Sequence, residues 1–186
     1  MRQWLGRSAR LAAAAGLCLV SGCGLVGGPV SLHQDAPDLM TVTSPMVEQG
    51  AIAPRYTCKS NGGRGESPPI SWLDAPAGTK SVALVVDDAA APISPRAYWI
   101  VFDINPATSE LQAGALPTGA LQAANSAGTT GYEPPCPAGS PHRYRFTVYA
   151  LDKVLAQKSG TPLREAWQAI AAHAIARGRF VATARP

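Results

Sequence analysis

The chain has 186 residues and a formal net charge of +4, from 16 basic and 12 acidic residues. Three of the basic residues and none of the acidic ones precede Cys23, so the chain from Cys23 onward carries only +1. A remainder this close to neutral, with no basic stripe between aromatic residues, excludes nucleic-acid binding as an expected function.

Residues 1–22 predict an export signal rather than the start of a fold. Three arginines without an acidic residue precede the apolar run Leu11–Val20, and the small pair Ser21-Gly22 stands directly before Cys23. This order is that of a secretory signal peptide. Ten apolar residues are too few for a membrane-spanning helix, which needs about 20.

The string from Leu19 to Cys23 resembles the lipobox of bacterial lipoproteins, in which the peptide is cut before the cysteine and the cysteine is acylated. We therefore expect lipid on Cys23 to hold the protein on the extracytoplasmic face of the cell membrane, since several acyl chains anchor stably where one does not. The alternative is a plain secretory signal that happens to end in cysteine. Residues 23–38, with glycine, proline and serine but no periodicity, predict a flexible tether. Residues 39–186 are enough for one domain with one core.

Short apolar segments between frequent prolines and glycines predict a mainly β domain. The predicted strands are Met40–Val47, Ile70–Trp72, Ser81–Val86, Ala97–Ile104, His142–Leu151 and Arg179–Thr183. Ile70–Trp72 follows two prolines and is expected at a sheet edge. The continuous apolar run Ser81–Val86 is expected in the centre of a sheet, buried on both faces. His142–Leu151 alternates, with Tyr144 and Phe146 on one face and Arg143 and Arg145 on the other.

One or two peripheral helices are expected, including a C-terminal helix over about residues 162–177. Pro162 is placed to open it, and Leu163, Trp167 and Ile170 follow at helical spacing. Gly178 is expected to end it.

Two carboxylates, Asp87 and Asp88, follow the apolar run Ser81–Val86. Adjacent residues of a strand point to opposite faces, so the two cannot share one role. We expect one of them to cap a turn and the other to face a pocket.

Five strings occur in a characteristic order over most of the chain after Cys23: Tyr56–Cys58, Ser67–Trp72, Tyr98–Phe102, Gly131–Pro137 and Ser140–Asp152. They resemble the phosphatidylethanolamine-binding protein (PEBP) family, in its bacterial branch of Raf-kinase-inhibitor-like proteins. The resemblance implies a PEBP-like β-sandwich with a large antiparallel sheet and a small pocket that accepts anions such as phosphate groups. The alanine- and arginine-rich composition hints at a high-GC source such as an actinobacterium.

Carried over by position, the family's pocket falls on Asp88, Tyr98, His142 and Tyr144. Two family residues have changed, because an aspartate of the first motif is Ala90 here and a histidine is Tyr98. The expected ligand is a small anion or phosphorylated head group, for which lipid head groups near the anchor are the nearest candidates. Binding should be weaker than in a complete site, because a tyrosine hydroxyl donates only a neutral hydrogen bond. The alternative is a scaffold whose degenerate pocket binds nothing in particular.

Cys58 and Cys136 remain once Cys18 leaves with the signal and Cys23 takes lipid. Both occupy motif positions of the resemblance, near the pocket. Two cysteines in an oxidising compartment predict a disulfide, and the alternatives are two free thiols or a metal pair. Two cysteines alone do not make a zinc site, so no metal is expected.

Two functions of different class fit these features. The first is a binder of a small ligand. The second, which the family resemblance implies, is a protein-interaction or inhibitor module that acts on a protease or a kinase pathway through surface loops. An open slot at Asp88, His142 and Tyr144 would favour the ligand, whereas a slot filled by Tyr98 would favour the partner. No enzymatic activity is expected, since Ser140 before a proline is more simply a turn residue than a nucleophile. No cofactor is expected, because no nucleotide fingerprint is present.

Overall fold

The computed structural model describes residues 36–90 and 96–186. The predicted signal peptide, the predicted lipidation site Cys23 and the predicted tether up to residue 35 lie outside the described residues. No helix of the described ranges is both long enough and apolar enough to cross a membrane.

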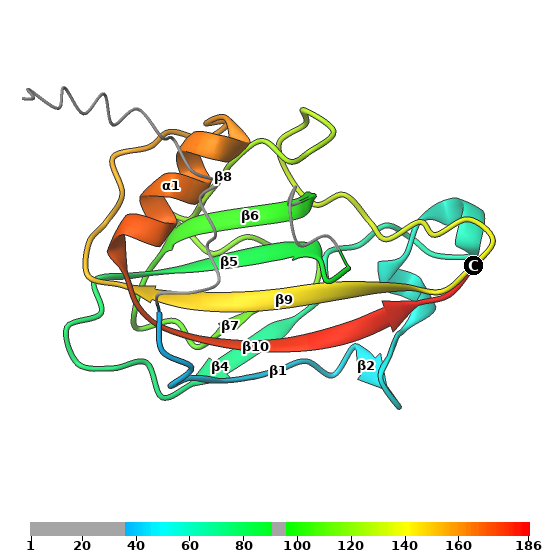
Figure 1. Cartoon of the computed structure of the whole chain (residues 1–186), viewed down its shortest axis with the longest axis horizontal. Helices are drawn as coiled ribbons and strands as arrows, with labels where there is room; N and C mark the ends of the chain where they lie inside the picture. The colour runs from blue at the N-terminus through cyan, green and yellow to red at the C-terminus, as the bar shows by residue number, and fades with distance from the viewer. Residues whose placement is uncertain (1–35, 91–95) are drawn as a thin grey trace, which may run out of the picture.

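Two sheets and one α-helix make up the described fold (Figure 1). The large sheet has the order β2-β3-β10-β9-β5-β6-β8, with β2 at Val47–Glu48, β3 at Ala51–Ile52, β10 at Ala174–Ala184, β9 at His142–Leu151, β5 at Ser81–Asp88, β6 at Ala97–Ile104 and β8 at Leu121–Gln122. The small sheet has the order β1-β4-β7, with β1 at Thr41–Thr43, β4 at Ile70–Leu73 and β7 at Glu110–Leu111. The helix α1 spans Leu163–His173, and two 3₁₀ turns, η1 (Pro54–Tyr56) and η2 (Lys59–Asn61), follow β3. The predicted mainly β fold with a large, chiefly antiparallel sheet is confirmed.

The centre of the large sheet is built from the segments whose sequences read most clearly as strands. Every residue of β5 except Asp88 is buried, as the continuous apolar run predicts. β9 covers the predicted residues His142–Leu151 and pairs antiparallel with both β5 and β10. The two ends of β9 lie toward the two sides of the molecule in Figure 1 and are roughly 30 Å apart at the usual strand rise of ~3.3 Å per residue.

The alternation of β9 divides the core into two halves. Tyr144, Phe146 and Val148 face the cluster between the two sheets, which also holds Trp72 of β4. Tyr149 and Leu151 belong to a second cluster, which the buried residues Ala166, Trp167 and Ile170 of α1 complete on the other face. The helix covers the end of the sheet where β9 finishes and leaves the opposite end uncovered, as Figure 1 shows.

The predicted end of the helix was wrong. α1 stops at His173 and the chain continues as β10 from Ala174, which makes the last strand eleven residues long instead of five. Pairing with β9 overrides the helical preference of the alanine-rich stretch, since Ala174 lies opposite Leu151 and Ala176 opposite Ala150. Pro162, predicted inside the first turn, is the N-cap residue.

Gly178 is a strand residue and not a helix stop. Residues 36–40, partly assigned above to the tether, pack on β10 here, with Asp38 bridged to Arg177. A Cβ atom on Gly178 would lie 2.2 Å from the carbonyl oxygen of Met40. The glycine is needed because two backbones approach each other closely.

Gly178→Ala is therefore expected to lower the free energy of unfolding by about 3 kcal/mol, because the closest atom is the backbone oxygen of Met40, which no side-chain rotation can move away. Gly50→Ala is the comparison. Gly50 has a φ of 80° and nothing within 4 Å of its would-be Cβ, so only the left-handed backbone costs about 1 kcal/mol. Chemical denaturation measures both, and equal losses would contradict the close approach at Gly178.

Two further strand predictions need correction. β4 is the central strand of the small sheet and not an edge, because β1 pairs with one side of it and β7 with the other. The predicted strand Met40–Val47 is interrupted, since β1 ends at Thr43 and β2 begins at Val47 in a different sheet. Ser44 lies in the break, and its hydroxyl donates to the carbonyl of Pro69 at 2.5 Å.

Candidate functional site

A cavity of about 300 Å³ opens at the end of the large sheet where β5 finishes and β9 begins. It gathers all four residues that the resemblance assigned to a pocket. Its lining residues are Asp88, Arg96, Tyr98, Glu133, Pro134, Cys136, Pro137, His142 and Tyr144. The pairing of Asp88 with Tyr144 across β5 and β9 brings segments more than fifty residues apart to this place.

Asp88 and His142 form a pair inside the cavity. His142 Nε2 lies 2.9 Å from Asp88 Oδ2, and the Asp88 side chain is 13 % exposed. The other carboxylate oxygen, Oδ1, accepts a hydrogen bond from the backbone N–H of Ala90 at 2.8 Å. Asp88 thus both caps the turn after β5 and faces the cavity. The prediction had assigned one of these roles to Asp87 and the other to Asp88.

Asp87 has a different role from either one predicted. Its side chain is fully buried and lies opposite Arg145 of β9, with Arg145 Nη2 at 2.5 Å from Oδ2 and Nε at 3.0 Å from Oδ1. A buried carboxylate requires such a partner, because an unpaired charge in the interior is costly. This ion pair supports the strands directly behind the cavity.

Two tyrosines form the inner wall. The rings of Tyr98 and Tyr144 meet edge to face, with centroids 4.9 Å apart, and the ring of His142 lies 5.3 Å from that of Tyr144. Burial raises the pKa of Tyr98. The pKa of Tyr144 is also raised, first by burial and then by the neighbouring Tyr98. Both phenols therefore keep their protons near neutral pH and can donate neutral hydrogen bonds.

Arg96 and Glu133 line the cavity and were missed in the sequence. Arg96 Nη2 lies 2.6 Å from Glu133 Oε1, and the guanidinium also stacks over the Tyr98 ring at 5.0 Å from its centroid. Glu133 Oε2 is buried and has no hydrogen-bond partner among residues 36–90 and 96–186. Arg96 stands two positions before Tyr98, so strand periodicity could have found it. Glu133 lies within the Gly131–Pro137 string.

The cavity wall is held by the predicted disulfide. Cys58 and Cys136 are joined with their Cα atoms 5.2 Å apart, and Cys136 lines the cavity. The backbone N–H of Cys58 also donates to the carbonyl of Pro135 at 3.0 Å. The bridge therefore ties the wall segment around Cys136 to the 3₁₀ turns after β3.

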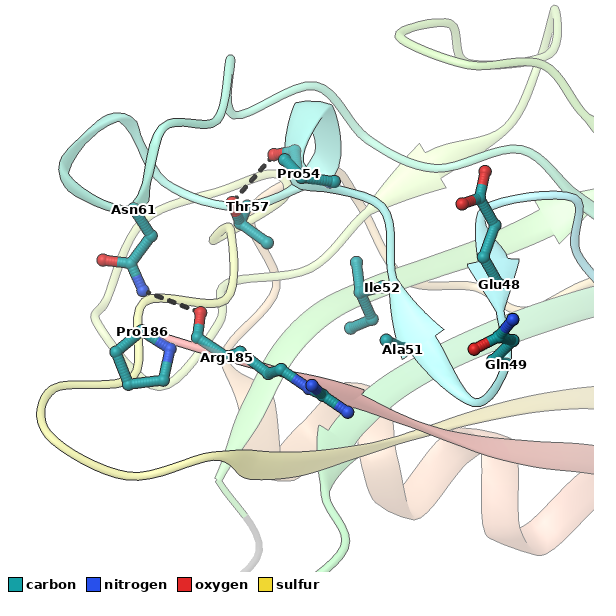
Figure 2. Close-up of a pocket in the computed structure, with 9 residues that line it drawn as sticks. All are labelled: Glu48, Gln49, Ala51, Ile52, Pro54, Thr57, Asn61, Arg185 and Pro186. Atoms are coloured by element: carbon teal, nitrogen blue, oxygen red, sulfur yellow. Dashed lines mark hydrogen bonds between the residues drawn. The ribbon is translucent and has the colours of Figure 1, made fainter.

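A second cavity, of about 320 Å³, lies at the same end of the domain, between the β2–β3 hairpin and the C-terminal residues (Figure 2). Figure 2 shows Arg185 beside Ala51 on one side and Asn61, which donates to the Arg185 carbonyl at 3.3 Å, on the other. Its charged lining residues are Glu48 and Arg185, and it contains no histidine or tyrosine. The two cavities are similar in volume, so their lining residues decide between them. The histidine and two tyrosines of the Asp88–His142 cavity make it the candidate site.

The arrangement at Asp88 and His142 is a mixed set of charges. Two carboxylates, Asp88 and Glu133, alternate with the cationic Arg96 and the titratable His142, and two phenol hydroxyls complete the wall. Within the part of the chain that the structure describes, no three histidine, cysteine or carboxylate side chains come together as metal ligands. The lining therefore offers hydrogen-bond donors from Arg96, His142 and the two phenols beside acceptors from the two carboxylates.

Comparisons of sequence identify relatives of the chain. A family model described as "Phosphatidylethanolamine-binding protein" matches residues 43–185. A UPF0098 protein of Methanothermobacter thermautotrophicus is 38% identical over 139 residues, which cover 72% of this chain and 90% of that protein. A Mycobacterium tuberculosis protein described as "Putative lipoprotein LppC" is 38% identical over 192 aligned positions, which cover 92% of this chain and 94% of that protein.

Solved structures show the same fold. The crystal structure of CT736 from Chlamydia trachomatis, described as a PEBP homologue, matches with a TM-score of 0.69 and 38% identity, covering 78% of this chain and 97% of that one. The crystal structure of YbcL from E. coli, described as a new member of the mammalian PEBP family, matches with a TM-score of 0.72 and 28% identity, covering 80% of this chain and 99% of that one.

Proposed function

The chain belongs to the phosphatidylethanolamine-binding protein family, and on that basis we propose that it binds a small phosphorylated or otherwise anionic group in the Asp88–His142 cavity. The observation that carries the proposal is the convergence of Asp88, Tyr98, His142 and Tyr144 on one open cavity of about 300 Å³. An open cavity supports a ligand over the interaction module, for which a slot filled by Tyr98 was expected. The proposed function is binding without turnover.

The charges around the cavity favour a zwitterion over a bare anion. The Arg96 guanidinium and a ring N–H of His142 suit a phosphate, because hydrogen bonds to a charged group are roughly twice as strong as neutral ones. Asp88 and the buried Oε2 of Glu133 suit an ammonium group beside it. Phosphoethanolamine combines both groups and is the natural probe.

The second part of the proposal is the location. Acylation of Cys23 would anchor the domain on the extracytoplasmic face of the cell membrane. The mycobacterial relative described as a lipoprotein aligns over 92% of this chain and supports this reading. A disulfide in the domain also suits an oxidising compartment.

A titration of the full chain with phosphoethanolamine, followed by NMR of ¹⁵N-labelled histidine side chains, tests the pocket. His173 is a matched internal control, because its Nδ1 lies 2.9 Å from Asp152 Oδ1 at the opposite end of the domain. The His142 signal is expected to shift in the millimolar range while the His173 signal stays still. No shift at His142, or equal shifts at both, would contradict ligand binding here.

His142→Gln is expected to weaken phosphoethanolamine binding by about tenfold, since one hydrogen bond to a charged group, worth about 1.5 kcal/mol, is lost. His173→Gln, the matched variant, should bind as the unmodified chain does. Calorimetric titration measures both affinities. Unchanged binding by His142→Gln would move the ligand away from this cavity.

A further inference from the structure

The two ends of the domain differ sharply in their surfaces. The end where β9 finishes carries the three most exposed large apolar side chains among the described residues: Leu39 at 57% exposed, Leu73 at 63% and Val154 at 58%. The other end carries the Asp88–His142 cavity and the C-terminal residues, and Figure 1 shows the two ends at the left and right of the molecule.

Strand pairing places the three apolar residues at the same end. The backbone N–H of Leu39 donates to the carbonyl of Arg177, which lies opposite Tyr149 near the end of β9. Leu73 ends β4 opposite Thr41 of β1, and Thr41 comes two residues after Leu39 in the chain. Val154 comes three residues after Leu151, in the loop that leaves β9. We refer to Leu39, Leu73 and Val154 as the apolar end patch.

Lysines flank this patch. Lys80 is exposed where its backbone N–H donates to the carbonyl of Leu151, and Lys153 is exposed beside Val154. The nearby carboxylates have partners, since Asp74 accepts from the Thr41 hydroxyl and Asp152 contacts His173. Exposed leucine and valine side chains next to long, exposed lysine side chains suit the boundary between acyl chains and phosphate head groups.

The chain enters the described fold at this end. Ala36 is buried, and the carbonyl of Pro37 accepts from the N–H of Arg177, close to Leu39. Cys23 and Ala36 are thirteen positions apart, so even a fully extended connection reaches at most ~45 Å. An anchor on Cys23 would therefore keep the apolar end patch within reach of the bilayer.

We propose that the apolar end patch docks on the bilayer that holds the lipid anchor, so that the Asp88–His142 cavity opens away from that membrane. The inference rests on the proposed anchor at Cys23. It refines the expectation that head groups near the anchor are the nearest ligands, because the cavity lies roughly 30 Å beyond the patch, the length of β9. The ligand is then a water-soluble group that carries the same phosphate chemistry.

Site-specific labelling tests this orientation in the lipidated full chain on vesicles of phosphatidylcholine and phosphatidylglycerol. With Cys58 and Cys136 joined and Cys23 acylated, one added cysteine takes an environment-sensitive fluorophore. Leu73→Cys reports on the patch, and Ala138→Cys, exposed beside the cavity, is the matched control. Quenchers on the acyl chains are expected to quench the label at position 73 several-fold more than at position 138.

The other outcomes would each contradict the proposal. Equal quenching at both positions, or stronger quenching at position 138, would overturn the orientation. A blue-shifted label at position 73 in the Cys23→Ala chain without vesicles would show that another part of this chain or a second copy covers the patch. Absence of the lipidated chain from floated vesicles would defeat the anchor and the orientation together.

A competition separates the two sources of ligand. The vesicle-bound chain is expected to bind soluble phosphoethanolamine equally well whether or not the vesicles contain phosphatidylethanolamine. Competition by the lipid would overturn the outward-facing cavity. A failed titration in both vesicles, with the label at position 73 still quenched, would contradict the proposed pocket function alone.

Discussion

Arg145→Ala is expected to lower the free energy of unfolding by about 3–5 kcal/mol, the usual cost of breaking a buried ion pair. The Asp87 side chain is fully buried and the Arg145 side chain is 17% exposed, with two contacts between them at 2.5 and 3.0 Å. Removing Arg145 takes away the cationic side chain that lies opposite the buried Asp87 carboxylate on β9. Most of the loss comes from that desolvated charge and not from the missing attraction.

Arg179→Ala is the matched control for this prediction. Arg179 lies opposite Thr147 of β9, so it occupies the neighbouring part of the same sheet. Its partner Asp38 is 50% exposed and lies at 3.4 Å, and exposed pairs contribute less than about 1 kcal/mol. Urea denaturation of both variants measures the difference. Losses of equal size would show that the Asp87–Arg145 pair does not support the sheet.

Removal of the Cys58–Cys136 bridge is the second large effect. Replacing both cysteines by alanine is expected to cost about 4 kcal/mol, because the bridge closes a separation of 78 residues and restricts the unfolded chain. The variant should also bind phosphoethanolamine more weakly, since Cys136 is part of the cavity wall.

Ser60→Ala separates the bridge from its surroundings. The Ser60 hydroxyl lies 3.0 Å from Cys58 Sγ and 3.1 Å from Cys136 Sγ, and its loss leaves the covalent bond intact. We expect a change below about 1 kcal/mol for this variant, the scale of a single neutral hydrogen bond. Two thiols that can be alkylated in the unreduced full chain, beyond any from Cys18 or Cys23, would refute the bridge itself.

The central strands of the large sheet could be predicted because their apolar residues already indicate burial. β5 and β6 are nearly continuous apolar runs, and β9 alternates between two buried clusters. The end of α1 could not be predicted, because the stretch from Ala169 to Ala176 favours a helix locally and only the partner strand β9 decides otherwise. Gly178 was misread for the same reason, since the backbone that crosses it comes from Met40.

The candidate site was likewise predicted only in part. Asp88, Tyr98, His142 and Tyr144 were assigned through the family resemblance, and the structure gathers them around one cavity. Arg96 and Glu133 were missed because their contribution depends on their contact with each other across 37 positions of the chain. The distinct roles of Asp87 and Asp88 depend on which face of β5 meets Arg145 and which meets the cavity.

Soaking a crystal of the protein in phosphoethanolamine shows whether the Asp88–His142 cavity is the binding site. We predict density for the ligand in this cavity of about 300 Å³, with its phosphate near His142 and Arg96 and its amine toward Glu133 or Asp88. An empty Asp88–His142 cavity at millimolar ligand, or density only in the second cavity beside Glu48 and Arg185, would contradict it.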